Sequence, residues 1–192
     1  MNRLAIALSA ALLFGLAGDA AAQGFINPFV GTTLTSPYPG GAHSKPGFGL
    51  AFGKIGEVVG LESEIAFYPE LLDSAANALA KNRALTFSGN LLVGPTIGRA
   101  KVYGAAGAGD LHLNFTSLKS LVTPNPDSLS SDKFAINVGG GAMGFFNAHL
   151  GVRGDLRYYR AFGVDLADLE LGRLNVTHFN FWRANIGLVA KF

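Results

Sequence analysis

The sequence predicts an all-β protein, an eight-stranded antiparallel up-and-down transmembrane β-barrel, and three observations indicate this fold class. The chain is 49% hydrophobic and holds 26 glycines and 15 phenylalanines. After residue 22, no apolar run reaches the roughly 20 residues that a membrane-spanning helix needs. Apolar and polar residues instead alternate over short segments, and the connections between these segments alternate between long and short. Both patterns are typical of membrane barrels, whose periplasmic turns are short.

The first element is predicted to be a cleaved signal peptide, residues 1–22. Arg3 provides a positive charge, residues 4–16 form an apolar run, and Ala20-Ala21-Ala22-Gln23 resembles a cleavage site. The apolar run is too short to cross a bilayer as a helix. We therefore expect one domain, residues 23–192, which is secreted through an inner membrane.

Eight strands are predicted in the remaining chain: 24–35, 46–55, 58–68, 84–95, 100–116, 133–147, 149–161 and 179–192. The connections after the first, third, fifth and seventh strands are long, and the others are tight turns. An even strand number places both ends of the barrel domain on the periplasmic side, so that the four long connections face outward. The first, second and sixth strands are rich in glycine, and their faces are not assigned.

The clearer strands each have one face without charge and one polar face. In the strand 149–161, Leu150, Val152, Leu156 and Tyr158 oppose Arg153, Asp155 and Arg157. Arg or Lys facing lipid at the bilayer midplane costs about 2–4 kcal/mol, so we expect the polar faces to point inward. The residues predicted to form this polar network in the lumen are Glu62, Glu64, Ser88, Asn90, Asp110, His112, Asn114, Arg153, Asp155, Arg157 and Arg183. Since eight strands leave room only for side chains, we expect an interlocked interior and not an open pore.

The last strand carries the clearest signal. In Trp182–Phe192, the residues Trp182, Ala184, Ile186, Leu188, Ala190 and Phe192 share one face. This strand resembles the closing strand of bacterial outer-membrane barrels. Together with Gly24–Gly31 and the alternation pattern, residues 24–192 resemble the OmpA-like and OmpX-like eight-stranded barrels. The resemblance implies a monomer in outer-membrane lipid and recognition by the barrel assembly machinery through Trp182 and Phe192.

Function is less determined than fold. We expect a structural or surface-interaction role through the four outer connections, with an extracellular partner that the sequence does not identify. One alternative is a small porin. Another is a lipid A-modifying enzyme, in which Asp110 and His112 could act with Ser88 or Glu64. The periplasmic peptidoglycan-binding domain of some family members is not expected, because the chain ends at Phe192. A soluble lipocalin-like barrel is the structural alternative.

Other functional classes find little support. The net charge is +2 without a basic cluster, so nucleic-acid binding is not expected. Cysteine is absent, and none of the four histidines has metal-ligand spacing. The segment Gly139–Gly144 matches G-x-G-x-x-G, but it lies inside a predicted strand and not before a helix. No cofactor or metal is therefore expected.

Overall fold

The computed structural model describes residues 22–34, 44–69, 80–117, 129–162 and 178–192, with side chains placed throughout these ranges except at 80–83, 113–117, 129–132 and 178–179. Secondary structure in this part of the chain is entirely β. The strands are β1 (Gln23–Thr33), β2 (Pro46–Ile55), β3 (Val59–Tyr68), β4 (Ala80–Val93), β5 (Thr96–Ile97), β6 (Ala100–Ser117), β7 (Leu129–Phe145), β8 (Leu150–Phe162) and β9 (His178–Lys191).

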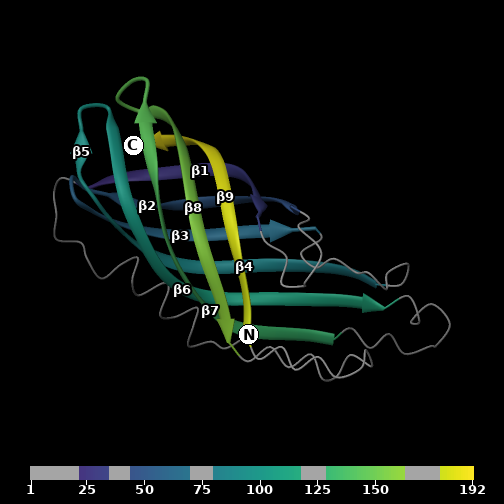
Figure 1. Cartoon of the computed structure of the whole chain (residues 1–192). Helices are drawn as coiled ribbons and strands as arrows, with labels where there is room; N and C mark the ends of the chain where they lie inside the picture. Colours follow the sequence, from purple (N-terminus) through teal and green to yellow (C-terminus); the bar gives the residue numbers. More distant parts are fainter. Residues whose placement is uncertain (1–21, 35–43, 70–79, 118–128, 163–177) are drawn as a thin grey trace.

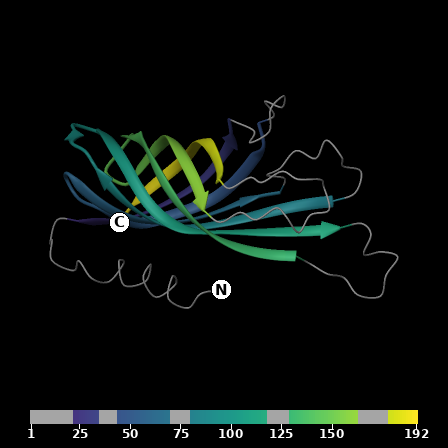
Figure 2. The same ribbon diagram turned by 60° about the horizontal axis from the view of Figure 1, so that its bottom comes forward.

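The strands form one closed antiparallel sheet (Figures 1 and 2). Neighbours in the chain pair with each other, and β4 pairs directly with β6, so that the two-residue β5 is only a ribbon in the turn between them. Pairing of β1 with β9, from Phe25↔Lys191 to Thr33↔Arg183, closes the ring. The result is the predicted eight-stranded barrel.

The barrel has two unlike ends. Three tight turns, 56–58, 94–99 and 146–149, lie at the end where β1 begins and β9 finishes, which we call the short-turn end. Gly98 in the second turn has a φ of 61°, a conformation that glycine adopts without steric cost. The four longer connections leave from the opposite end, the loop end, and lie outside the described residues. The same is true of residues 1–21 of the predicted signal peptide.

Side-chain burial alternates along the strands as a barrel requires. In β8, every second residue from Gly151 to Ala161 is buried, and the residues between them are mostly exposed. The exposed set includes Leu150, Val152 and Leu156, which have no protein to cover them. Large apolar side chains on the outer surface and charged ones inside are the reverse of a soluble barrel, so the lipocalin-like alternative is wrong.

Aromatic side chains border this apolar surface. Near the loop end, neighbouring strands bring rings together in three pairs, with centroids 5.3–6.4 Å apart: Tyr158–Trp182, Phe48–Phe67 and Phe134–Phe162. At the short-turn end, Phe146 and Phe192 are 64% and 79% exposed. Two such levels of aromatic residues mark the two interfaces of a membrane around a barrel.

Glycines on the inner face make space for large side chains. A Cβ atom at Gly47 would lie 2.4 Å from the Tyr68 ring. One at Gly141 would lie 2.6 Å from both the Tyr103 hydroxyl and the Asp155 Cβ. The inner glycines are therefore needed for a filled lumen, and alanine at either position would force a shift.

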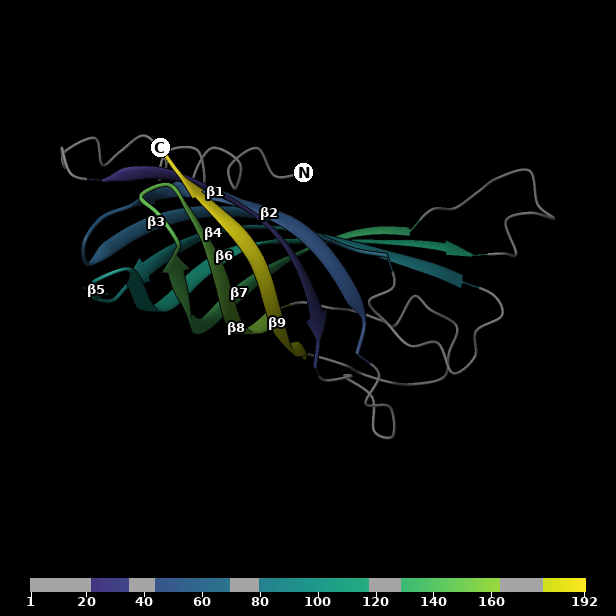
Figure 3. The same ribbon diagram turned by 90° about the horizontal axis from the view of Figure 1, so that it is seen from above.

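Three neighbouring strands extend beyond their flanking strands at the loop end. β4, β6 and β7 have 14, 18 and 17 residues. Their mutual pairing continues to Ala80↔Ser117 and Phe115↔Leu129, whereas the flanking β3–β4 and β7–β8 ladders end earlier, at Tyr68↔Ala84 and Ala135↔Ala161. Residues 80–83, 112–117 and 129–134 thus form a three-stranded extension past the neighbouring strands at the loop end (Figure 3).

The predicted strands are confirmed, with boundary differences of a few residues. The largest are the starts of β4 and β7, which begin at Ala80 and Leu129, four residues before the predicted starts. Both extra segments belong to the three-stranded extension. No helix within the described residues is long and apolar enough to cross a membrane.

Candidate functional site: the charge layer in the lumen

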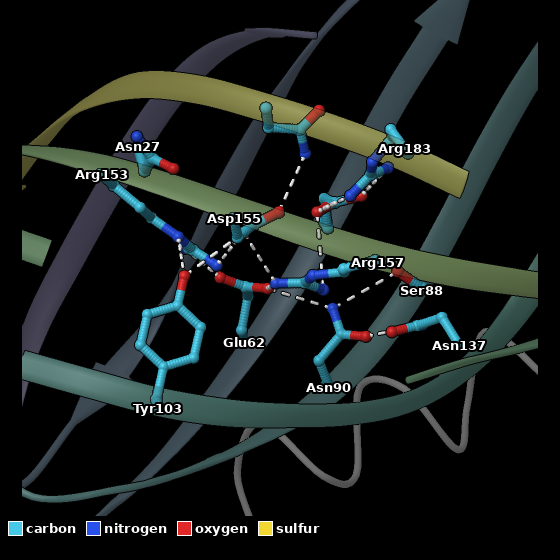
Figure 4. Close-up of polar contacts among 12 residues, drawn as sticks. Asn27, Glu62, Ser88, Asn90, Tyr103, Asn137, Arg153, Asp155, Arg157 and Arg183 are labelled. Atoms are coloured by element: carbon cyan, nitrogen blue, oxygen red, sulfur yellow. Dashed lines mark hydrogen bonds and ion pairs between the residues drawn. The ribbon is translucent and has the colours of Figure 1, made fainter. Parts of the chain in front are cut away.

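Six charged side chains form a layer across the middle of the lumen (Figure 4). Glu62 and Glu64 come from β3, Arg153, Asp155 and Arg157 from β8, and Arg183 from β9. Those on the same strand are separated by an even number of positions, so they lie on one face of the sheet. All six are at most 8% exposed. We call this set the charge layer.

Glu62 joins β3 to β8 across the lumen. Its carboxylate pairs with Nη1 of Arg153, and Nη2 of Arg157 donates to Oε1 at 2.7 Å. The amide of Asn90, on β4, donates to the same oxygen at 3.1 Å. Asn137 on β7 in turn donates to Asn90 Oδ1 at 2.8 Å, so the polar contacts continue across β4 to β7.

Asp155 binds the two arginines of its own strand. Its Oδ2 accepts from Arg153 Nη2 at 2.8 Å and from Arg157 Nη2 at 3.2 Å. The Tyr103 hydroxyl, from β6, donates to the same oxygen at 3.3 Å and accepts from Arg153 Nε at 2.7 Å. The other carboxylate oxygen accepts from Asn185 on β9 at 3.3 Å. This one carboxylate therefore connects three strands.

Glu64 and Arg183 form a bidentate pair. Arg183 Nη1 and Nη2 donate to the two carboxylate oxygens at 2.6 and 2.7 Å. The guanidinium carbon lies 4.7 Å from the Tyr159 ring centroid and 5.5 Å from that of Phe29. Arg157 also approaches Glu64, at 3.7 Å. Bidentate, aromatic-covered geometry is the arrangement in which a buried arginine is best accommodated.

The charge layer is balanced, with three carboxylates and three guanidinium groups. Each of its carboxylates accepts hydrogen bonds from an arginine, so none is free to take up a proton as a catalytic base. Removing one partner of such a buried pair typically costs about 3–5 kcal/mol, because the remaining charge is left without compensation. The arrangement suits a rigid cross-link better than a reaction centre.

Apolar side chains close the lumen on both sides of the charge layer. The cluster toward the loop end, which we call the loop-side cluster, contains Phe29, Ala51, Ala66, Tyr68, Ala84, Leu111, Tyr159, Ala161 and Phe181. The cluster toward the turns, the turn-side cluster, contains Phe25, Ile55, Leu92, Tyr103, Ala105, Met143 and Val189. The interior is thus layered, with the polar charge layer between two apolar clusters.

Lys101 closes the short-turn end. Its ammonium group is buried and donates to the carbonyl oxygens of Gly56, Glu57 and Gly94 at 2.8–3.0 Å. Three donors meet three acceptors, so the group is fully satisfied. These bonds hold two of the tight turns against β6, below the turn-side cluster.

Eight of the eleven predicted lumen residues lie on the inner face: Glu62, Glu64, Ser88, Asn90, Arg153, Asp155, Arg157 and Arg183 are all buried. The side chain of Asn114 lies outside the described part of the chain. The predicted list of lumen residues did not include the inward-facing Lys101, Tyr103, Asn137 and Tyr159, although the alternation of β8 predicts that Tyr159 shares the face of Arg157. Lys101 and Tyr103 occupy odd-numbered positions on β6. These two polar residues were the sequence signal that could have identified the inner face of that strand.

The predicted face of β6 is wrong for Asp110 and His112. Leu111, between them, is 1% exposed and belongs to the loop-side cluster, whereas Asp110 and His112 are only partly buried on the opposite face. Asp110 pairs with Phe87 and Phe134, near the loop end. At this level, the outer face of the strand approaches water, so that charge there carries little cost.

One small cavity lies beside the loop-side cluster. Its lining includes Ser88, Asn137, Tyr159 and Phe181, and Asn137 Oδ1 is buried without a hydrogen-bond partner. The space available to the centre of a water molecule is about 10 Å³, about the minimum for one ordered water. The described residues contain no group of three or more His, Cys, Asp and Glu that could hold a metal ion.

Comparison with known proteins agrees with this architecture. Residues 7–192 match the family model described as outer membrane protein beta-barrel domain. The chain belongs to this family and is a β-barrel protein of the cell outer membrane, as the resemblance to OmpA-like barrels predicted. A search of curated proteins found no match.

Solved structures share the fold at low sequence identity. Neisserial surface protein A is 8% identical with a TM-score of 0.61, and the match covers 91% of this chain and 97% of that one. A major outer membrane protein from Thermus thermophilus is 16% identical with a TM-score of 0.61, covering 90% and 100%. Ail from Yersinia pestis, in complex with the heparin analogue sucrose octasulfate, is 15% identical with a TM-score of 0.58, covering 90% and 99%.

Proposed function

We propose that this protein is a non-conducting structural barrel whose loop end serves surface interaction. The observation that carries the first half is the filled lumen. The charge layer links β3 to β8 and β9 by direct ion pairs, and an apolar cluster lies on each side of it. A hydrated ion would have to separate these pairs and enter two apolar layers. A small porin is therefore the less favoured alternative.

The three-stranded extension supports the surface role. β7 continues past its last pair with β8, and β4 continues past its last pair with β3. The extension therefore presents two strand edges at the loop end, where an extended peptide could add by main-chain hydrogen bonds. Its outer face carries Asp110 and His112 at its base. The extracellular partner is not identified by this geometry.

A lipid A-modifying enzyme is not favoured. The sequence suggested Asp110 and His112 acting with Ser88 or Glu64, but Ser88 and Glu64 are buried in the lumen. Asp110 and His112 lie on the other face of the sheet, so these residues do not converge. We propose that the protein is not an enzyme, that it is a monomer, and that it reaches the outer membrane through the assembly machinery by way of Trp182 and Phe192.

Planar-bilayer recording of the purified protein tests the proposal. We expect no stable unit conductance, because the ion pairs of the charge layer and the two apolar clusters lie across the described part of the lumen. Heat-modifiable migration of the same sample shows that it is folded, and a known porin inserted in the same bilayer shows that the recording detects channels. A reproducible single-channel step from the folded protein would contradict the proposal and favour the porin.

A further inference from the structure

The short-turn end has an excess of positive charge. Its described charged side chains are Lys54, Arg99, Lys101 and Lys191 with a single acid, Glu57. Lys101 donates only to carbonyl oxygens, which do not cancel its charge. The charge layer is neutral as a whole and adds nothing to this balance. A fixed positive field therefore remains at the short-turn end.

The acids of the chain are concentrated elsewhere. Among the acidic side chains that the structure describes, Glu62, Glu64 and Asp155 lie in the charge layer and Asp110 lies near the loop end, which leaves Glu57 at the short-turn end. The basic residues at the short-turn end thus have few acidic neighbours. An anionic group from outside the chain is the natural counter-charge for them.

Two of these cations stand beside exposed aromatic rings. Lys54 pairs with Gly24, and Gly24 exchanges backbone hydrogen bonds of 3.0 and 2.9 Å with Phe192. The Phe192 ring lies over Gly24, since a Cβ there would be 2.5 Å from it. Lys54 is therefore next to an exposed aromatic side chain on the outer surface of the barrel. Neither side chain is covered by protein.

Arg99 has an equivalent position on the other side of this end. Its Nη1 donates to the carbonyl of Phe146 at 3.3 Å, and its own carbonyl accepts from Phe145 N at 2.8 Å. These bonds hold the exposed arginine beside Phe146, whose ring is also exposed. Each cation thus accompanies an aromatic residue at the level where the apolar surface ends. Aromatic side chains settle at the headgroup level of a membrane, so that the cations face the phosphate groups.

We propose that Lys54 and Arg99 form a binding surface for the phosphate groups of anionic phospholipids in the inner leaflet of the outer membrane. The occupant is a lipid and not a soluble anion, because each cation lies at the edge of the apolar surface beside an exposed ring. The short turns of outer-membrane barrels face the periplasm, which places these residues at the inner leaflet. This surface is separate from the loop end and from the lumen.

Native mass spectrometry of the folded protein, with single lipids added to its micelle, tests this proposal. The probes are phosphatidylglycerol and phosphatidylcholine of equal chain length. We expect tighter binding of phosphatidylglycerol and a loss of about fivefold for each of Lys54→Gln and Arg99→Gln. Arg160→Gln is the matched control, because Arg160 is exposed near the loop end, 5.5 Å from the Phe162 ring centroid. Phosphatidylglycerol affinity should change little in this variant.

Three results would overturn the proposal. Equal affinity for the two lipids would show that charge is not recognised. An equal loss in Arg160→Gln would place the effect on net charge and not on this end. Displacement of the lipid by glycerol phosphate at matched concentration would assign the surface to a free phosphate. Heat-modifiable migration of each variant shows that it is folded, and exposed side chains of this kind are not needed for the barrel.

Discussion

β8 and the half of β6 near the loop end have similar alternating sequences, but their polar residues face opposite sides of the sheet. In β8, Arg153, Asp155 and Arg157 point into the lumen, and Leu150, Val152 and Leu156 face lipid. In β6, Leu111 points into the lumen, whereas Asp110 and His112 lie on the outer face. The difference is one of depth. At the depth of the membrane, lipid favours an inward orientation of charge along β8. Near the loop end, water lies outside β6, so that Asp110 can face outward while Leu111 fills the lumen.

The comparison teaches that alternation identifies a strand but not its orientation. Along β6, the inner positions are set from the short-turn end, where Lys101 and Tyr103 are buried. Because the side-chain period of a strand is two, this choice continues to Leu111. The ladder with β4 has no bulge that would exchange the faces, and Asp110 stays opposite Phe87.

The largest expected effect is in the charge layer. Glu64→Leu would leave Arg183 buried without its bidentate partner, and we expect a loss of about 3–5 kcal/mol in the free energy of unfolding. The assay is unfolding of the purified barrel by urea in lipid, and heat-modifiable gel migration measures the folded fraction. Glu64→Leu/Arg183→Leu is the matched control. It removes both charges and should be less destabilised than the single variant, and equal or greater destabilisation would contradict this account.

The second prediction compares the two outer faces directly. Leu156→Arg places a charge on the lipid face of β8 and should cost about 2–4 kcal/mol if the site lies near the midplane. Asp110→Arg places the same side chain on the outer face of β6 near the interface and should cost about 0–1 kcal/mol. The same unfolding assay measures both. Equal costs would show that Asp110 lies as deep in the membrane as Leu156. This result would contradict the position of Asp110 near the loop end.

The smallest effect on stability is expected for Asp110→Cys, within about 0.5 kcal/mol, since the Asp110 side chain lies on the outer face of the barrel. This variant also allows the position of residue 110 to be tested by chemical labelling. The chain contains no cysteine, so a membrane-impermeant maleimide added to intact cells reports only the introduced thiol. We expect labelling of Asp110→Cys and none of Leu156→Cys. An unlabelled Asp110→Cys that labels only after cell lysis would place Asp110 away from the outer surface.

Much of the charge layer was predictable because lipid acts on its strands. Glu62, Glu64, Arg153, Asp155 and Arg157 lie in segments whose other face is apolar, and the cost of charge in lipid leaves only one orientation. The partners within the layer were not predictable. Glu64 binds Arg183 on a strand 119 residues away in the chain, and this pair depends on how β3 and β9 lie across the closed lumen.

The contacts of the buried tyrosines and the two apolar clusters were also beyond local reasoning. Tyr103 and Tyr159 are both buried beside the charge layer. The Tyr103 hydroxyl accepts a hydrogen bond from Arg153 and lies in the space left by Gly141, and the Tyr159 hydroxyl donates to Glu64. Such filling depends on side chains from opposite walls of the barrel, which no single strand contains.

The sequence by itself determined the membrane barrel, its eight strands and the inward orientation of charge along β3 and β8. It did so because lipid penalises charge at every second position, and this penalty is local to each strand. Only the tertiary structure decided the face of β6, the pairing of Glu64 with Arg183, and the apolar clusters that close the lumen. The pair and the clusters arise from closure of β1 on β9, which brings distant strands to a common interior. The face of β6 follows from its unbroken ladder with β4.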